Sequence, residues 1–352
     1  MAERTLIKWA DSSLNWWEGC TKVSDGCKNC YAEARDKRFT GGKLWGKGAP
    51  RRKSKSAVKS ALAMNRKPWI CDKCGVASHE NICWGKCESN KPVPITFHRR
   101  RIFSLSLGDW LDDEVPIEWL AEMLDTIRQC DQVTWILCTK RPQNFRNQMI
   151  AVMKWIENSD CPAKMDETHL WILDWMTGER IPTNIILLAS VENQAMADKR
   201  IPELLKIPAA CHGLSLEPLL ASVNVGPYIL SDRDKAGFDN QFLEPLGGFN
   251  NKKITWCIEG GESGSNARPC NVEWIRAIVQ DCEEYCCACF VKQLGSKPVC
   301  DCSVAVESFS ANCCQHFPNP ISDKKGGDIS EWPKDLRIQQ WPKEIRFTAT
   351  TP

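Results

Sequence analysis

The sequence predicts an α/β fold built on parallel strands, either a partial barrel or a doubly wound sheet. Six short apolar runs, rich in β-branched and aromatic residues, indicate buried strands that end in small or polar residues. Most of these runs are separated by segments with helical periodicity. Strand, helix and strand in alternation favour parallel strands joined by right-handed crossovers. The 352 residues are enough for one large domain of this kind or for two ordinary domains.

The six predicted strands are "RIFSLSLGDW", "TWILCTKRP", "NIILLASVEN", "CHGLSLEPL", "ITWCIEGGESG" and "CCACFVKQLG". The clearest helix is predicted over residues 116–129, where Pro116 stands at the likely first helical position and apolar residues recur on one face. Similar but weaker patterns predict helices over residues 195–207 and 271–285.

Charged and polar residues stand at the ends of the predicted strands. The carboxyl ends of parallel strands meet at one edge, where α/β folds build their active sites. Each residue taken singly could cap a loop, but so many on different strands predict a shared polar pocket. The set comprises Asp109, Lys140, Arg141, Glu192, Asn193, Glu217 and Glu262.

The stretch "NWWEGCTKVSDGCKNCYAEARDKRF", residues 15–39, holds Cys20, Cys27 and Cys30 with no fourth ligand nearby. Three thiolates bound to a four-iron cube leave one iron open for a substrate or cofactor. The glycines and turn-forming residues of this stretch suit a loop around a bulky cluster. From spacing alone, a zinc site completed from elsewhere and reduced thiols without metal remain alternatives.

A second cysteine-rich stretch, "CDKCGVASHENICWGKC", occupies residues 71–87 as an insertion before the first of the six strands. Two pairs of thiolates can close a tetrahedral structural zinc site, and such a site would staple a loop that has little apolar content. His79 is an alternative ligand. The alternative interpretation is that these cysteines are surface thiols that bind no metal. The proposed ligands are Cys71, Cys74, Cys83 and Cys87.

The 21 cysteines are an odd number, and no secretion signal precedes them. This argues against a disulfide framework and for metal, cluster or redox use of some thiols. Those in apolar surroundings, such as Cys130, Cys138, Cys211 and Cys257, are expected in the core. The cysteines from Cys282 onward cannot all meet, because some share a predicted strand. A further metal site using Cys300, Cys302, Cys313 or Cys314 with His316 stays an alternative.

The charge of the chain is uneven. Residues 1–101 hold 22 Lys and Arg against 9 Asp and Glu, whereas residues 102–352 hold 24 against 35. The basic first part indicates binding to nucleic acid, although a solvated face would also explain it. No apolar run approaches the ~18 residues of a membrane span, so we expect a cytoplasmic protein without membrane contact.

Several motifs in order along the chain resemble those of the phage-type three-Cys-motif family, a domain of unknown function. Besides the cysteine loop they include "SLSLGDWLDDEVP", "CTKRPQN", "LLASVENQAMADKRIPELLKIPA", "LSLEPLLASVNV", "IEGGESGSNARP", "FVKQLG" and the tail "KKGGDISEWPKDLRIQQWP". That family is similar to the radical S-adenosylmethionine (SAM) enzymes. The resemblance implies a partial (β/α) barrel and a gene carried by a phage or prophage in a bacterial host.

The resemblance also implies that Cys20, Cys27 and Cys30 ligate a [4Fe–4S] cluster that binds SAM. Electron transfer would cleave SAM to methionine and a 5′-deoxyadenosyl radical, which abstracts hydrogen from a substrate; the expected substrate is a nucleic-acid base. Tyr31 is expected near the adenine. Ser106, Ser190, Gly260 and Gly261 join the strand-end residues as candidates to hold SAM or substrate.

The expected organisation is one barrel-like domain over residues 1–295, with the insertion at 71–87, and a cysteine-rich tail and extension over 296–352. Two other functions remain open. The chain could be a non-catalytic nucleic-acid-binding protein containing zinc. It could also be a cluster-binding subunit that works with a separate three-Cys-motif partner protein.

Overall fold

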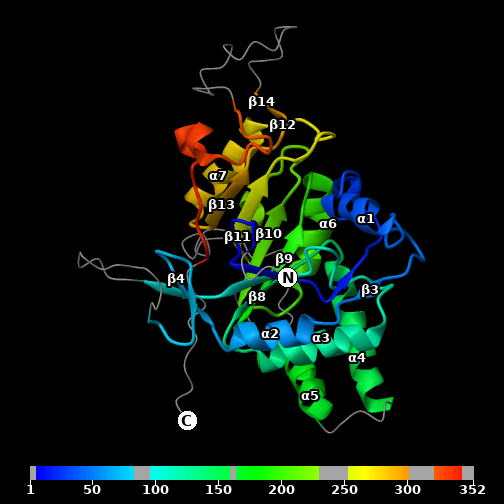
Figure 1. The fold of residues 1–352 in the computed structure, drawn as a ribbon. Helices are drawn as coiled ribbons and strands as arrows, with labels where there is room; N and C mark the ends of the chain where they lie inside the picture. Colours follow the sequence, from blue (N-terminus) through cyan, green and yellow to red (C-terminus); the bar gives the residue numbers. More distant parts are fainter. Residues whose placement is uncertain (1–4, 83–95, 159–163, 230–252, 301–320, 343–352) are drawn as a thin grey trace.

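Seven parallel strands form one curled sheet with the shape of half a barrel (Figure 1). The computed structural model describes residues 5–82, 96–158, 164–229, 253–300 and 321–342. All six predicted strands are present, so the prediction of an α/β fold with parallel strands is confirmed. Across the sheet, the order is β1 (Ser12–Leu14), β7 (Arg101–Ser104), β8 (Thr134–Thr139), β9 (Ile185–Ser190), β10 (Cys211–Leu216), β11 (Ile254–Gly260) and β13 (Ala288–Gln293).

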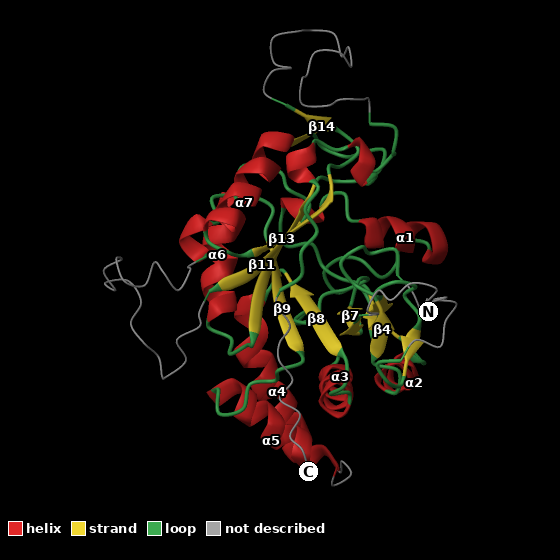
Figure 2. Ribbon diagram, turned by 90° about the vertical axis from the view of Figure 1, so that its left-hand side faces the viewer, coloured by secondary structure: helices red, strands yellow, loops and turns green. Residues whose placement is uncertain are grey.

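Helices pack on the outer side of this sheet. Those predicted over residues 116–129, 195–207 and 271–285 are confirmed as α3, α6 and α7. Figure 2 shows the strands fanning out, with α3, α6 and α7 along one side of the fan. The helices of the described residues are α1 (Tyr31–Thr40), α2 (Ala57–Asn65), α3 (Ile117–Gln129), α4 (Phe145–Asn158), α5 (Lys164–Thr177), α6 (Gln194–Leu205) and α7 (Val272–Glu284).

Smaller elements decorate the half-barrel. The insertion begins in a three-stranded antiparallel sheet of β4 (Trp69–Cys71), β5 (Ala77–Ser78) and β6 (Phe97–Arg99). Two further pairs join β2 (Trp17–Glu18) to β3 (Arg52–Lys53) and β12 (Cys270–Asn271) to β14 (Pro298–Val299). Short 3-10 helices are η1 (Asp25–Cys27), η2 (Pro142–Asn144), η3 (Gly226–Tyr228), η6 (Ile329–Glu331) and η7 (Lys334–Leu336).

The two faces of the sheet have different partners. On one face, strand residues such as Leu214 and Cys257 pack with Ile275 and other residues of the helices. Their neighbours along the strands point the opposite way, because strand side chains alternate. Trp256 and other residues of this second face pack in a cluster without helix residues. The second face is therefore the concave, inner face of the half-barrel.

Aromatic side chains fill the inner face near the amino ends of the strands. Trp9, from the segment before β1, packs against Phe103 and Trp256, with ring centroids 4.6 Å and 6.1 Å away. Trp341 packs against Phe290 at 5.1 Å and donates to the Trp9 carbonyl at 3.1 Å. The end of the C-terminal segment, at Trp341, thus covers the amino end of the half-barrel, and the polar residues lie toward the carboxyl end.

Farther along the strands, the inner face becomes polar. Cys138 follows Ile136 by two residues, Ser190 follows Leu188, and Lys292 follows Phe290. Residues two apart on a strand share a face, so these polar groups stand above the aromatic layer. Among the described helices, none has the length and apolar character that a membrane span requires.

Candidate metal and cofactor site

The loop carrying Cys20, Cys27 and Cys30 lies over the carboxyl ends of the strands. It follows β2, includes η1 and ends where α1 begins at Tyr31. In Figure 2, α1 lies on the opposite side of the fan of strands from α6 and α7. All three thiols are half-buried, and none is in a disulfide. They therefore face the space between the loop and the sheet edge.

Charged residues that follow strands β9 and β11 hold this loop. Glu192, fully buried, accepts from the Gly26 amide at 3.3 Å. Glu262 accepts from the Asn29 side chain at 2.9 Å and pairs with Arg268 at 2.7 Å. The two loop residues that these carboxylates bind, Gly26 and Asn29, lie on either side of Cys27. The predicted strand-end residues therefore hold the loop next to this cysteine.

Arg268 adds a further anchor, because its guanidinium donates to the carbonyl of Asp25 at 3.0 Å. Burial favours a higher pKa for Glu262, but hydrogen bonds from Arg268 and Asn29 outweigh it and lower the pKa below its usual value. The carboxylate stays ionised near neutral pH. The ion pair of Glu262 and Arg268 therefore holds the loop over the physiological pH range.

Arg141 connects the end of β8 to Cys20. Its two terminal nitrogens lie 3.6 and 3.7 Å from the Cys20 sulfur, and one of them donates to the Thr21 carbonyl at 2.6 Å. Asp109 accepts from Arg141 at 2.9 Å and from the Thr139 hydroxyl at 2.7 Å. Asp109 is therefore a positioning residue for the guanidinium, which places positive charge beside a thiol.

Burial raises the pKa of the Cys20 thiol to about 12; Asp109 adds to the rise and Arg141 opposes it. Burial also raises the pKa of Cys30. These thiols are protonated at neutral pH when nothing is bound. They are therefore poorly suited to act as free thiolate nucleophiles, since the thiolate is the reactive form.

The spacing of the three sulfurs distinguishes two kinds of metal site. Around one tetrahedral zinc ion, sulfurs lie about 3.8 Å apart, since each Zn–S bond is about 2.3 Å. The sulfurs of Cys20, Cys27 and Cys30 do not all come within 4.8 Å of one another. A four-iron cluster gives each thiolate its own iron and takes a wider spacing. The structure therefore does not bring the three thiols into a single-ion group.

Four side chains of the inner face lie below the loop. Cys138 and Ser190, on neighbouring strands, are 3.4 Å apart through their sulfur and hydroxyl oxygen. Glu217, just after β10, pairs with Lys292 of β13 at 2.7 Å. Lys140 is half-buried, and in the described part of the chain no hydrogen bond or ion pair is formed by its ammonium group. Lys140 is therefore the cation best placed to bind an anionic group of a ligand.

Other predicted residues have structural partners. The Tyr31 hydroxyl donates to the Ser106 carbonyl, while 60% of the Tyr31 residue is exposed. The Ser106 hydroxyl lies 3.2 Å from the Asn15 amide. Asn193 caps α6, where its side chain accepts from the Met196 amide at 3.0 Å. These contacts place Tyr31 and Ser106 at the loop, whereas Asn193 serves the helix.

The predicted zinc quartet is only partly within the described residues. Cys71 is buried at the end of β4, and Cys74 follows in the turn to β5. The turn between them is tight, since the Gly75 amide donates to the Cys71 carbonyl at 2.7 Å. Cys83 and Cys87 lie outside the described residues, so this site stays a prediction.

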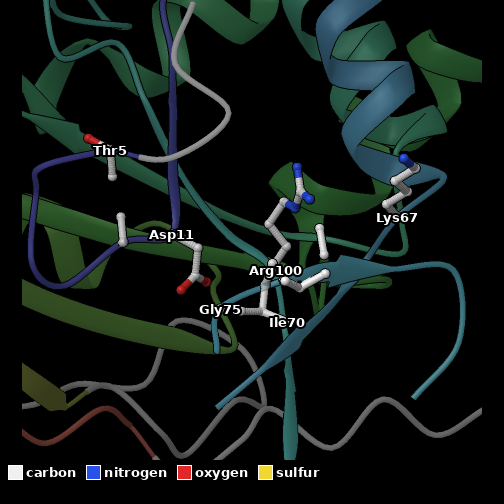
Figure 3. A pocket seen from close by; sticks show the side chains of 9 residues that line it. Thr5, Asp11, Lys67, Ile70, Gly75 and Arg100 are labelled. Carbon is white, nitrogen blue, oxygen red and sulfur yellow. The ribbon is translucent and has the colours of Figure 1, made fainter. Parts of the chain in front are cut away.

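A hollow of about 690 Å³ lies between this small sheet and the segment before β1. Figure 3 shows the side chains of Lys67 and Arg100 on one side of it, with Asp11 across from them. Asp11 is itself paired with Arg101 at 3.1 Å. The hollow therefore has a basic side close to the cysteine-rich insertion.

The comparisons with known proteins give a family but no activity. The model of a family described as "Protein of unknown function (DUF5131)" matches residues 4–315. The chain belongs to this family. Among the curated proteins and the solved structures that were compared, none matches the chain. The family description names neither SAM nor a cysteine motif, so a function has to be argued from the site itself.

In this member of the family, the paired glycines after β11 have a packing role. A Cβ at Gly261 would lie 2.4 Å from the Leu294 carbonyl oxygen and 2.8 Å from the Cys270 Cβ. A Cβ at Gly260 would lie 2.8 Å from the Gln293 carbonyl oxygen. Both glycines let two backbones approach closely, which explains them without a bound ligand.

Gly261→Ala is therefore expected to destabilise the fold by about 1–3 kcal/mol, because backbone atoms of Leu294 and Gly295, just after β13, must move to admit the methyl group. Urea unfolding followed by circular dichroism measures the change. Gly327→Ala is the matched control, since its nearest heavy atom would be 3.7 Å away. Equal stability of the two variants would contradict the packing role.

Some residues at the site escape prediction from sequence. Arg268, Lys292 and Cys138 all contact it, yet none was a candidate. Lys292 had a usable signal, since it is a lone charge inside the apolar run "CFVKQL". Arg268 had no such signal in the sequence, because only the fold brings it together with both Glu262 and Asp25.

Proposed function

We propose that this protein is an iron–sulfur enzyme of the radical SAM type. The observation that carries the proposal is the position of Cys20, Cys27 and Cys30. They stand on one loop over the carboxyl edge of a parallel half-barrel, and their sulfurs are not gathered into a single-ion group. When bound, a [4Fe–4S] cluster with SAM supplies a 5′-deoxyadenosyl radical that abstracts hydrogen from a substrate.

The residues of the chain would bind the cofactor and the substrate and orient them. Arg141 holds Cys20 in place and puts positive charge beside it. Glu192 and Glu262 fix the loop on either side of the second cysteine, through Gly26 and Asn29. Lys140, a half-buried cation near Glu192 and Cys30, would bind a carboxylate or phosphate of the cofactor or substrate.

Anaerobic reconstitution tests this function. The full chain is incubated with iron and sulfide, and SAM and a strong reductant are then added. We expect 5′-deoxyadenosine, measured by mass spectrometry, in the wild type. We expect a loss of at least about tenfold in Lys140→Ala, which retains its iron, because the variant lacks the anion-binding cation at the site. A colourless protein that takes up zinc alone would overturn the proposal.

A second function is favoured by the basic hollow. Lys67 and Arg100 lie beside an insertion with Cys71 and Cys74, and the first 101 residues are strongly basic. A non-catalytic protein with a zinc site would bind nucleic acid there, with affinity that falls steeply as salt rises. If a cluster forms but SAM is not cleaved, even with nucleic acid present, a subunit that acts with a partner protein becomes the better proposal.

A further inference from the structure

A second group of thiols lies on the outer face of the sheet, beneath α7. The sulfurs of Cys257, Cys282 and Cys287 all lie within 4.8 Å of one another, and all three side chains are buried. Cys282 is also within hydrogen-bonding contact of Cys289. Cys257 and Cys289 are paired residues of β11 and β13, so their side chains lie on the same face. Three thiols from separate elements thus converge at one point, and a fourth, that of Cys289, lies beside Cys282.

This group is separate from the cysteine loop. Cys282 is in the last turn of α7, and Cys287 is in the connection that leads from α7 to the start of β13. A helix that joins parallel strands runs back to their amino ends, so these thiols lie toward the edge opposite Cys20. They also point to the outer face, whereas the residues below the loop line the inner face. A metal ion bound to these buried thiols would therefore not be part of the site at the cysteine loop.

The geometry matches a single metal ion. A tetrahedral zinc ion holds its sulfurs about 3.8 Å apart, and a closed set of four thiolates is the usual structural zinc site. The limit of 4.8 Å that Cys257, Cys282 and Cys287 satisfy is close to this spacing. Three sulfurs therefore already have the spacing of ligands to one ion, and rotation of the Cys289 side chain toward its neighbour Cys282 would supply a fourth.

The surroundings are not those of a plain apolar core. Glu259 is fully buried, and one of its oxygens lies 3.2 Å from the Cys289 sulfur. Its other oxygen has no hydrogen-bond partner in the part of the chain that the structure describes. Leaving a buried polar atom unpaired costs about 1–3 kcal/mol, which core packing alone does not explain. Glu259 therefore places a polar group beside the thiols where a plain core would hold an apolar side chain.

An ion could reach the thiols through a neighbouring hollow of about 760 Å³. Its lining includes Cys282, Cys287 and Cys289, together with Thr255 and the exposed Cys286. Trp341 and other residues of the C-terminal segment form part of its wall. The thiols are thus buried by neighbouring side chains while remaining next to an open space.

From this convergence we infer that Cys257, Cys282, Cys287 and Cys289 bind a structural Zn²⁺ ion. The ion joins the end of α7 to β11 and β13, which stabilises the half-barrel near its last strand. Binding replaces sulfur-bound protons, which pass to solvent, and no electrons are exchanged. The inference is independent of any cluster at Cys20, Cys27 and Cys30.

The test uses the full chain in a background that lacks the thiols of the cysteine loop and the first pair of the predicted zinc quartet, and the Cys282→Ser comparison assigns the bound zinc. In this background, Cys20, Cys27 and Cys30 are Ala, and Cys71 and Cys74 are Ser, so the buried group is unchanged. After incubation with Zn²⁺ and removal of the excess, we expect one zinc per chain by mass spectrometry. Adding Cys282→Ser should remove that zinc, whereas adding Cys286→Ser, at an exposed thiol, should leave it.

The inference is overturned if the background protein holds no zinc, or if folded Cys282→Ser protein holds as much as its parent. Cys282→Ser lies in the core and could prevent folding. In that case, X-ray absorption at the zinc edge of the background protein decides the question. Four sulfur ligands at about 2.3 Å support the site, and fewer sulfur ligands reject it. A disulfide between any two of the four cysteines, seen in the intact mass, also rejects it.

Discussion

Replacing Cys20, Cys27 and Cys30 together by Ala is expected to abolish iron binding in protein reconstituted without oxygen. The wild type should hold about four irons and four sulfides per chain, and the variant should hold none. The physical reason is that each thiolate would bind a separate iron, and the loop offers no other described thiol as a substitute. Iron and sulfide assays and the visible absorption of the cluster measure the loss.

Cys286→Ser is the matched control for this experiment, since its thiol is exposed and lies on a different part of the chain. It should keep its full iron content and colour. The triple variant should still fold, because the three side chains are only half-buried. Circular dichroism checks this point. Iron retained in a folded triple variant would show that the cluster, if present, is held elsewhere, and the proposed function would fail with it.

Much of the fold can be predicted from the sequence because its strands are buried on both faces. Runs such as "TWILCT" and "IILLAS" are continuously apolar, which is typical of parallel strands covered by helices. The order of strands then follows from the connections between them. β1 is missed because it has only three residues, and its partner β7 is far along the chain.

The approximate place of the site can also be predicted, but the role of each residue cannot. Strand-end residues such as Glu192 and Glu262 do meet the cysteine loop. Their roles depend on partners such as Arg200 and Arg268, which the fold brings close. Gly261 is explained by a close approach of two strands, a contact that the motif "GGESG" does not reveal.

The group of buried thiols also could not be predicted from the sequence. Cys257 stands in an apolar run, where a cysteine is ordinarily a core residue. Its proximity to Cys282 and Cys287 arises because α7 returns across β11 and β13. Spacing along the chain cannot indicate this proximity, because Cys257 lies in β11, whereas Cys282 and Cys287 lie at the end of α7 and just beyond it.

Glu192→Ala is expected to be the most destabilising single substitution near the loop. Glu192 and Arg200 form a buried ion pair at 2.7 Å, with side chains 0% and 2% exposed. Removing the carboxylate leaves the guanidinium buried with the Ser190 carbonyl as its remaining acceptor, which typically costs about 3–5 kcal/mol. Urea unfolding of the protein without iron measures this difference directly.

Glu203→Ala, on α6 with Arg200, is the matched control. Glu203 pairs with Lys206 at the surface, with side chains 34% and 63% exposed. Exposed pairs contribute about 0–1 kcal/mol, so this variant should unfold close to the wild type. Glu192→Gln should fall between the two, because it keeps a hydrogen-bond acceptor for Arg200 but lacks the charge. Equal effects of Glu192→Ala and Glu203→Ala would contradict a buried, energetically important pair.

The pH dependence of the same variant gives an independent test. Burial favours a higher pKa for Glu192, but Arg200, Ser24 and Lys140 outweigh it, and the pKa lies below its usual value. A lowered pKa contributes stability above the unfolded pKa of about 4.3, and this contribution is lost as the pH falls through the folded pKa. The gap in stability between wild type and Glu192→Ala should therefore be largest near neutral pH and narrow in acid. Because Glu192 also accepts from Gly26, the destabilised variant should load less iron at pH 7 than Glu203→Ala.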